Sequence, residues 1–156
     1  MMKILIVDDN ADNRRLLRLN LEHQGSVTVV EACDGQEGLE LARQHHPNLI
    51  ISDALMPRLD GYQFLRLLKG EEALRDIPFV FYSAIYTDTK DEELALSLGA
   101  AAYIAKPMEP EAFQAELSAI LRSLEVEKEH PGTPIQLEEE KEYLRKYSDV
   151  VAEKLK

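Results

Sequence analysis

Three carboxylates stand directly after two short apolar runs, and they are well placed to do chemistry. Asp8 and Asp9 follow the run 3–7, and Asp53 follows the run 48–52. If the two runs are neighbouring buried strands, the three acids converge on one point. At about 4 Å and a surface-like dielectric, two like charges repel by roughly 4 kcal/mol. Such a cluster predicts either one strongly raised pKa or a hard divalent cation among the carboxylates.

Two further apolar runs end next to groups that complement these acids. The run 78–82 is followed by the hydroxyl of Ser83, and the run 101–105 is followed by the cation of Lys106. Acid, hydroxyl and cation would then each come from the end of a separate strand. Together they indicate a site that holds a phosphoryl group.

The elements that position these residues alternate between apolar runs and amphipathic stretches. Strands are expected over 3–7, 27–30, 48–52, 78–82 and 101–105. Helices are expected over 13–23, 35–45, 62–68, 91–98 and 111–124. Five strand–helix repeats with continuously apolar strands predict the α/β class, with a doubly wound, five-stranded parallel sheet. In such a sheet the ligand site lies beyond the carboxyl ends of the strands, where the residues above stand.

The chain after residue 124 has a different amino-acid composition. Residues 125–136 contain the turn-forming run His-Pro-Gly-Thr-Pro, which is typical of a linker. Residues 137–156 lack Gly and Pro, and they predict an additional amphipathic C-terminal helix about 30 Å long. Three of its apolar residues are spaced seven apart, at Leu137, Leu144 and Val151. This connector helix either forms a short coiled-coil seam or folds back on the domain over 1–124, and the pattern leaves both open.

Charge and composition exclude several classes of function. A formal charge of −11 opposes broad electrostatic attachment to nucleic acid or to an anionic membrane. No apolar stretch approaches the roughly 20 residues that a membrane span requires, and the first apolar run is too short for a signal peptide. Cys33 is the single cysteine, so no intrachain disulfide can form. We therefore expect a cytoplasmic protein with no nucleic-acid and no membrane partner.

Five stretches together resemble the receiver domain of two-component response regulators. They occur in the family's order and spacing, as Ile4–Asp9, Leu49–Pro57, Asp60-Gly61, Phe81–Ala84 and Tyr103–Pro107. The resemblance implies a flavodoxin-like (βα)5 receiver fold and a phosphorylation-dependent signalling module of a two-component or phosphorelay system. It also implies that Asp53 accepts a phosphoryl group from the phosphohistidine of a histidine kinase or a histidine phosphotransfer protein. Such a module is regulatory and not a metabolic enzyme, with only self-phosphorylation and self-dephosphorylation chemistry.

The resemblance further implies a magnesium site made by the acids. Asp9 and Asp53 would bind Mg²⁺ directly, Asp8 would act mainly through water, and the backbone carbonyl of Leu55 would complete the protein's share. Oxygen ligands of this kind are those that Mg²⁺ prefers. No other cofactor is expected.

A switch is implied by two of the remaining residues. Lys106 is the cation expected to pair with the phosphoryl group, and the Ser83 hydroxyl is expected to donate a hydrogen bond to it. Tyr103 would then move from an exposed to a buried position. The face that changes, and that would control an output or partner, is made by the segments 91–98, 101–105 and 111–124.

Two other classes use a related fold or related groups. A phosphatase of the haloacid dehalogenase class needs an acid two residues after its Asp nucleophile. That position is Asn10 after Asp8 and Leu55 after Asp53, so the general acid is missing. A flavodoxin-like cofactor binder would need a Gly-rich phosphate loop after the first strand, and none occurs. Both alternatives are disfavoured.

Some expectations concern residues around the site. Leu55 and Ile85 border the path of the attacking water in the family, and their apolar side chains predict a long-lived phosphoryl group. Cys33 is expected to fill a small space near the end of the second strand. Three arginines are expected on the solvated face of the first helix, at Arg14, Arg15 and Arg18. A homodimer would form through the switching face or the C-terminal helix, and the chain is either a stand-alone regulator or part of a larger sensory protein.

Overall fold

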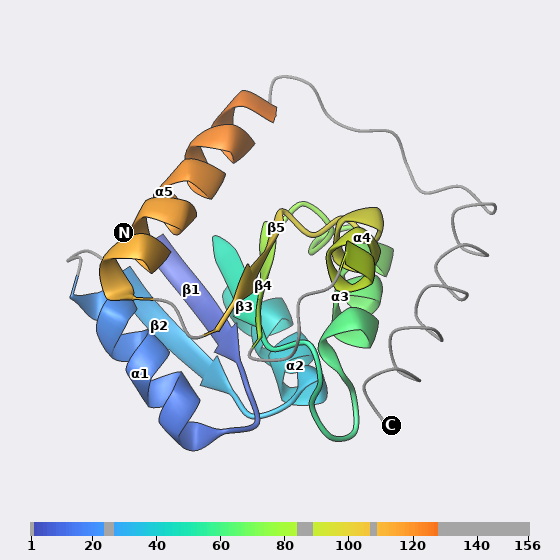
Figure 1. Ribbon diagram of the computed structural model, residues 1–156. Coiled ribbons are helices and arrows are strands. Elements are labelled where there is room, and N and C mark those ends of the chain that lie inside the picture. Colours follow the sequence, from blue (N-terminus) through green and yellow to red (C-terminus); the bar gives the residue numbers. More distant parts are fainter. Residues whose placement is uncertain (1, 24–26, 84–88, 107–108, 128–156) are drawn as a thin grey trace.

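The computed structural model describes residues 2–23, 27–83, 89–106 and 109–127. Within them, five parallel strands form one sheet in the order β2-β1-β3-β4-β5 (Figure 1). The strands are β1 (Met2–Val7), β2 (Val27–Ala32), β3 (Leu49–Ser52), β4 (Phe79–Ser83) and β5 (Ala102–Ala105). The helices are α1 (Ala11–Glu22), α2 (Gly35–His45), α3 (Gly61–Gly70), α4 (Thr89–Ser97) and α5 (Pro110–Glu127). The predicted α/β class and the doubly wound parallel sheet are confirmed. The expected helix over 137–156 and Ile85 lie outside the described residues.

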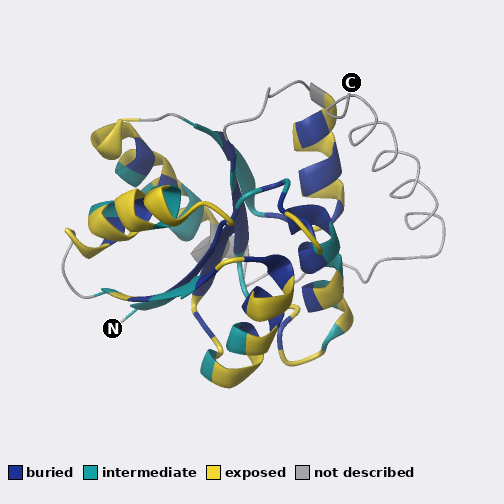
Figure 2. Ribbon diagram, turned by 90° about the horizontal axis from the view of Figure 1, so that it is seen from below, coloured by how far each residue is buried: buried dark blue, intermediate teal, exposed yellow. Residues whose placement is uncertain are grey.

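The two faces of the sheet are covered by separate apolar clusters. One cluster packs α2, α3 and α4 on the sheet, through residues such as Leu39, Phe64 and Leu94. The other packs α1 and α5 on the opposite face, through Leu17 and Phe113 among others. Figure 2 shows the buried strands in dark blue between helices whose outer sides are yellow. Because helices cover both faces, the strands are apolar throughout instead of alternating.

The strand register brings the carboxyl ends of the strands to one edge of the sheet. Val7 at the end of β1 pairs with Ser52 at the end of β3. Ser83 at the end of β4 pairs with Ala105 at the end of β5. Backbone hydrogen bonds continue this alignment past the strands, since Asp53 N–H donates to the Val7 carbonyl at 2.9 Å. The residues that follow the strands are therefore held side by side.

Side-chain caps decide where several helices begin. The Asn10 side chain accepts a hydrogen bond from the backbone N–H of Asn13 at 3.0 Å, so α1 starts at Ala11. The expectation of a start at Asn13 was wrong by two residues. Asp60 and Gln63 form a reciprocal capping box at the start of α3. At the other end of the domain, α5 continues to Glu127, past the expected boundary at residue 124.

Candidate functional site

The three predicted acids meet at the carboxyl edge of the sheet. One carboxylate oxygen from each of Asp8, Asp9 and Asp53 lies within 4.8 Å of the other two. Asp8 is buried, Asp53 is half-buried and Asp9 is exposed, so the group opens to solvent on one side. Two oxygen ligands on opposite sides of one Mg²⁺ ion lie about 4.2 Å apart, since each metal–oxygen distance is about 2.1 Å. The three carboxylates therefore offer the oxygen ligands that Mg²⁺ prefers, at a spread close to the separation of two of its ligands.

Asp8 has a partner at each of its polar groups. Its Oδ1 accepts a hydrogen bond from the Asn10 backbone N–H at 2.9 Å, and its Oδ2 accepts one from Lys106 Nζ at 2.8 Å. Its backbone N–H donates to the Ala32 carbonyl at 3.2 Å, and its own carbonyl accepts from Arg14 Nη1 at 2.6 Å. The most buried acid of the group is thus fixed in place and neutralised by a cation.

The surroundings of Asp53 hold the pKa of its carboxyl above the ordinary value. Burial raises the pKa of the Asp53 carboxyl, and the charge of Asp8 raises it further. The positive charge of Lys106 lowers the same pKa, as do hydrogen bonds from the Ser83 side chain and the Ala54 backbone N–H. The Ala54 N–H lies 2.8 Å from Asp53 Oδ1 and orients the carboxylate. A cation brought to this pocket would therefore relieve an existing excess of negative charge.

Lys106 is drawn into the site from the end of β5. Its backbone N–H donates to the Ser83 carbonyl at 2.8 Å, which continues the β4–β5 pairing. Its side chain is only 12% exposed, and its Nζ lies 5.2 Å from the ring centre of Tyr82. A lysine whose ammonium group is shielded between Asp8 and an aromatic ring differs from an ordinary solvated surface lysine.

The two residues predicted to form a switch lie behind the acids. Ser83 is fully buried. The Tyr103 ring stacks on Phe81 with the ring centres 5.7 Å apart, and its side chain packs against the cluster under α2, α3 and α4. Burial, followed by the negative charge of Asp91, raises the pKa of Tyr103 to about 12. Tyr103 therefore already occupies an inward position in this structure.

The loop between β3 and α3 passes close to the phosphoacceptor candidate. Gly61 lies so near that a Cβ there would be 2.2 Å from the Asp53 carbonyl oxygen. The Gly61 N–H donates to the Ala54 carbonyl at 2.8 Å, which closes the loop tightly. The Leu55 side chain packs against the cluster under α2, α3 and α4. Asp53 is therefore presented by a compact loop that leaves no room for a larger residue at position 61.

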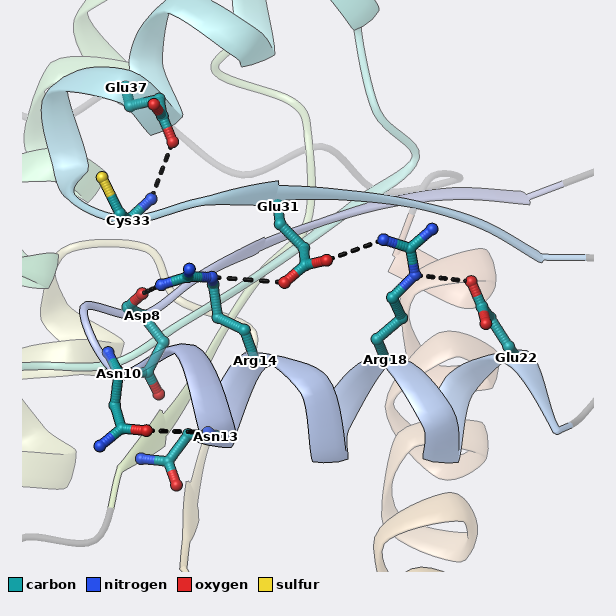
Figure 3. A network of polar contacts seen from close by, with 9 residues as sticks. All are labelled: Asp8, Asn10, Asn13, Arg14, Arg18, Glu22, Glu31, Cys33 and Glu37. Carbon is teal, nitrogen blue, oxygen red and sulfur yellow. Dashed lines mark hydrogen bonds and ion pairs between the residues drawn. The ribbon is translucent and has the colours of Figure 1, made fainter.

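Arg14 has a place that the sequence analysis did not predict. The expectation that it lies on the solvated face of α1 is wrong, because its side chain is 18% exposed and contacts both Asp8 and Glu31 (Figure 3). Arg18 is also paired, with Glu22 and Glu31. The spacing of Arg14 and Arg18, four residues apart, places them on one side of α1. Their shared partner, Glu31 on β2, is brought near only by the tertiary fold.

Two other positions differ from or add to the expectations. Cys33 is exposed, so it does not fill a buried space as predicted, and its N–H donates to Glu37 at 2.9 Å. Tyr62 is fully buried, with its ring centre 5.0 Å from that of Phe81. Phe81 in turn stacks on Tyr103. A continuous aromatic contact thus joins the start of α3 to the switch candidate.

Comparison with known proteins agrees with this geometry. The sequence profile described as the response regulator receiver domain matches residues 4–118. The chain belongs to the response regulator receiver family. Receiver domains serve phosphorylation-dependent two-component signalling and are regulatory rather than catalytic domains. The resemblance found in the sequence is confirmed.

Solved receiver domains share the fold. The chemotaxis protein CheY4 of Vibrio cholerae has a TM-score of 0.72 and 28% identity, and the match covers 77% of this chain and 98% of that one. The signal receiver domain of a signal transduction histidine kinase from Syntrophus aciditrophicus has a TM-score of 0.70 and 31% identity, over 88% of this chain and 98% of that one.

Curated relatives are longer than the present chain. The probable transcriptional regulator ycf27 of Porphyridium aerugineum is 38% identical over 123 residues, which are 79% of this chain and 49% of the relative. The alkaline phosphatase synthesis transcriptional regulatory protein PhoP of Bacillus subtilis is 38% identical over 128 residues, 80% of this chain and 50% of that protein. The chain therefore spans about half the length of the curated relatives that it matches. No helix in the described part of this receiver domain is long and apolar enough to cross a membrane.

Proposed function

We propose that this receiver domain accepts a phosphoryl group on Asp53 from the phosphohistidine of a histidine kinase or a histidine phosphotransfer protein. The observation that carries the proposal is the meeting of Asp8, Asp9 and Asp53 with Lys106 and Ser83 at one edge of the sheet. An Asp53 carboxylate oxygen forms a bond to phosphorus as the phosphorus–nitrogen bond to the donor imidazole breaks. The bond's electron pair goes to the imidazole nitrogen, and an acyl phosphate remains on Asp53.

The residues around Asp53 have complementary roles in this proposal. Asp9 and Asp53 would hold Mg²⁺ directly, Asp8 would act through water, and the carbonyl of Leu55 would complete the protein's ligands. When bound, the metal supplies positive charge that neutralises the phosphoryl oxygens and the acids. Lys106 stands next to Asp8, at 2.8 Å, and is the cation available to pair with the phosphoryl group.

The switch would run from Ser83 to Tyr103. Ser83 is buried beside Asp53, and its hydroxyl donates a hydrogen bond to the Asp53 carboxylate. After phosphorylation the hydroxyl can donate to a phosphoryl oxygen instead. The β4–α4 loop would follow Ser83, and Tyr103 would be held inward against Phe81. The local charge change would thereby bias the face made by α4, β5 and α5 toward an output or partner. The domain would carry no other catalytic activity than its own phosphorylation and dephosphorylation.

Two classes of output are compatible with this domain. The relatives that match are named as transcriptional regulators and are about twice as long as this chain. A nucleic-acid-binding output outside the present residues is therefore a second candidate, beside the sequence-based expectation of no nucleic-acid partner. A homodimer through the α4-β5-α5 face, or through the helix that the sequence predicts over 137–156, would fit either output. We propose a cytoplasmic location, where a kinase donor would be available.

The expected long lifetime of the phosphoryl group rests on the apolar side chains of Leu55 and Ile85. Ile85 lies outside the described residues.

Phosphorylation by acetyl phosphate tests the proposal. The protein is incubated with acetyl phosphate and Mg²⁺, and intact and peptide masses are recorded. One phosphoryl group is expected on the peptide that contains Asp53, with none in Asp53→Asn or after removal of Mg²⁺ with EDTA. Asp12→Asn is the matched control, because Asp12 is an exposed acid on α1 outside the cluster. Label on another residue, or equal label in Asp53→Asn, would refute the assignment.

A further inference from the structure

Arg14 links the acidic site to the body of the domain. Its Nη1 donates to the carbonyl oxygen of Asp8 at 2.6 Å, and its Nε donates to Glu31 Oε1 at 3.3 Å (Figure 3). The guanidinium group is planar and rigid, so two partners in different directions fix its orientation. Arg14 therefore connects the loop after β1 to a carboxylate on β2.

Further ion pairs hold the far end of this connection. Glu31 Oε2 accepts from Arg18 Nη1 at 2.7 Å, and Arg18 Nε donates to Glu22 Oε1 at 2.8 Å. The side chains become more exposed along the row, from 18% for Arg14 to 44% for Arg18. Figure 3 shows the four charged groups, three from α1 and Glu31 from β2, alternating in sign and ending at Asp8. In a network of this kind each side chain restricts the next, so Arg14 is held better than in an isolated pair.

The group that Arg14 binds belongs to the peptide between the two neighbouring acids. The carbonyl of Asp8 and the N–H of Asp9 lie in one planar unit, so fixing the carbonyl also fixes the direction in which the chain enters Asp9. The Asp8 carboxylate is held by Lys106 and by the Asn10 backbone N–H. The Asn10 contact fixes the peptide that follows Asp9, but not the Asp8–Asp9 peptide that precedes it. Asp9 itself is exposed. Arg14 is thus the side chain that fixes the orientation of the Asp8–Asp9 peptide, and through it the direction of the Asp9 side chain.

We propose that Arg14 is a positioning residue for the metal site, which orients the Asp8–Asp9 peptide so that the Asp9 carboxylate meets that of Asp53. The inference rests on the proposed function, since it assumes that the acids hold Mg²⁺. A positioning role and a simple charge effect predict opposite changes in Mg²⁺ affinity when Arg14 is replaced. A nearby cation repels Mg²⁺, so removing the charge alone would tighten metal binding. Removing a group that orients a ligand weakens metal binding.

Magnesium titration by calorimetry distinguishes the two effects. We expect Arg14→Gln to bind Mg²⁺ about tenfold more weakly than the wild type, at the lower end of the range for lost outer-shell partners. Arg14→Lys keeps the positive charge but cannot donate to Asp8 and Glu31 from one rigid, planar group, so a similar loss of Mg²⁺ affinity is expected. Arg15→Gln is the matched control, because it removes the same charge from the exposed neighbouring position. Its Mg²⁺ affinity is expected to stay within about twofold of the wild type or to rise slightly.

The outcomes separate this inference from the proposed function. Arg14→Gln affinity equal to or tighter than that of the wild type would overturn the positioning role, whereas absence of Mg²⁺ binding by the wild type would overturn the proposed metal site itself. Phosphorylation by acetyl phosphate supplies a second measurement, in which Arg14→Gln should need more Mg²⁺ for half-maximal rate while reaching a similar maximum. If thermal unfolding shows that Arg14→Gln is not folded, Arg18→Gln decides. It loosens the outer end of the row, so weaker Mg²⁺ binding supports the role and unchanged or tighter binding refutes it.

Discussion

At the scale of single residues, the ion pair between Asp8 and Lys106 balances part of the negative charge of the three clustered acids. Both side chains are largely buried, at 8% and 12% exposure, and their charged atoms are 2.8 Å apart. A buried pair of this kind gains little net stability, because desolvation offsets the attraction between the charges. Its consequence is local instead. Burial raises the pKa of Asp53, the proposed phosphoacceptor, and the charge of Lys106, which pairs with Asp8, only partly offsets that rise.

The phenol of Tyr103 gives a prediction about alkaline pH. Its pKa is about 12 in the folded protein, above the ordinary value of 10.0, chiefly because of burial. The folded state holds this proton more tightly than the unfolded state, so the stabilisation present below pH 10 is lost as the pH rises toward 12. We expect the free energy of unfolding to fall in this window, and to fall less steeply in Tyr103→Phe. Denaturant unfolding at several pH values measures both slopes, and equal slopes would show that Tyr103 is not buried in solution.

At the scale of secondary structure elements, the start of α3 constrains the loop that carries Asp53. A Cβ at Gly61 would lie 2.2 Å from the Asp53 carbonyl oxygen and 2.9 Å from the Phe81 ring. A Cβ at Gly70, at the end of the same helix, would meet no atom within 4 Å. The fold therefore requires glycine at position 61, where α3 approaches the Asp53 backbone closely. It does not require glycine at position 70.

Opposite effects are expected from alanine at these two positions. Gly61→Ala should lower the free energy of unfolding by about 1–3 kcal/mol, as overpacking does, and should reduce phosphorylation because the Asp53 backbone must shift. Gly70→Ala should raise the free energy of unfolding by up to about 1 kcal/mol, because alanine favours the helix. Denaturant unfolding of both variants gives the comparison. A Gly61→Ala protein as stable as Gly70→Ala would contradict the tight loop.

The elements also show what the sequence could predict. The apolar runs before Asp8, Asp53 and Lys106 were sufficient to place the strand ends, because strands buried on both faces leave a continuous apolar pattern. The start of α1 was missed because the cap is Asn10, whose hydrogen bond to the backbone leaves no periodic signal. The role of Arg14 was missed for a different reason. Helical periodicity describes one helix, whereas the partner Glu31 lies on a strand that only the fold brings near.

At the scale of the whole molecule, metal binding should appear as stability. A ligand that binds only the folded state raises the free energy of unfolding by RT ln(1 + [L]/Kd), which is about 2.7 kcal/mol when the ligand is at 100 times its Kd. Mg²⁺ should therefore raise the melting temperature of the wild type, and EDTA should reverse the change. Asp9→Asn should lose most of the increase, while Asp12→Asn on α1 should keep it. Thermal unfolding followed by circular dichroism makes the measurement, and an equal increase in all three proteins would exclude the cluster as its source.

The route of the chain through the sheet has a consequence for protein synthesis. Asp8 and Lys106 touch although 98 positions separate them, because β1 and β5 lie in one sheet with β3 and β4 between them. A ribosome that has made only the first four strands has produced Asp8, Asp9 and Asp53 without Lys106, the cation that pairs with Asp8. A nascent chain that lacks β5 therefore holds the acids of the pocket without this ion pair, which can form only after translation has reached Lys106.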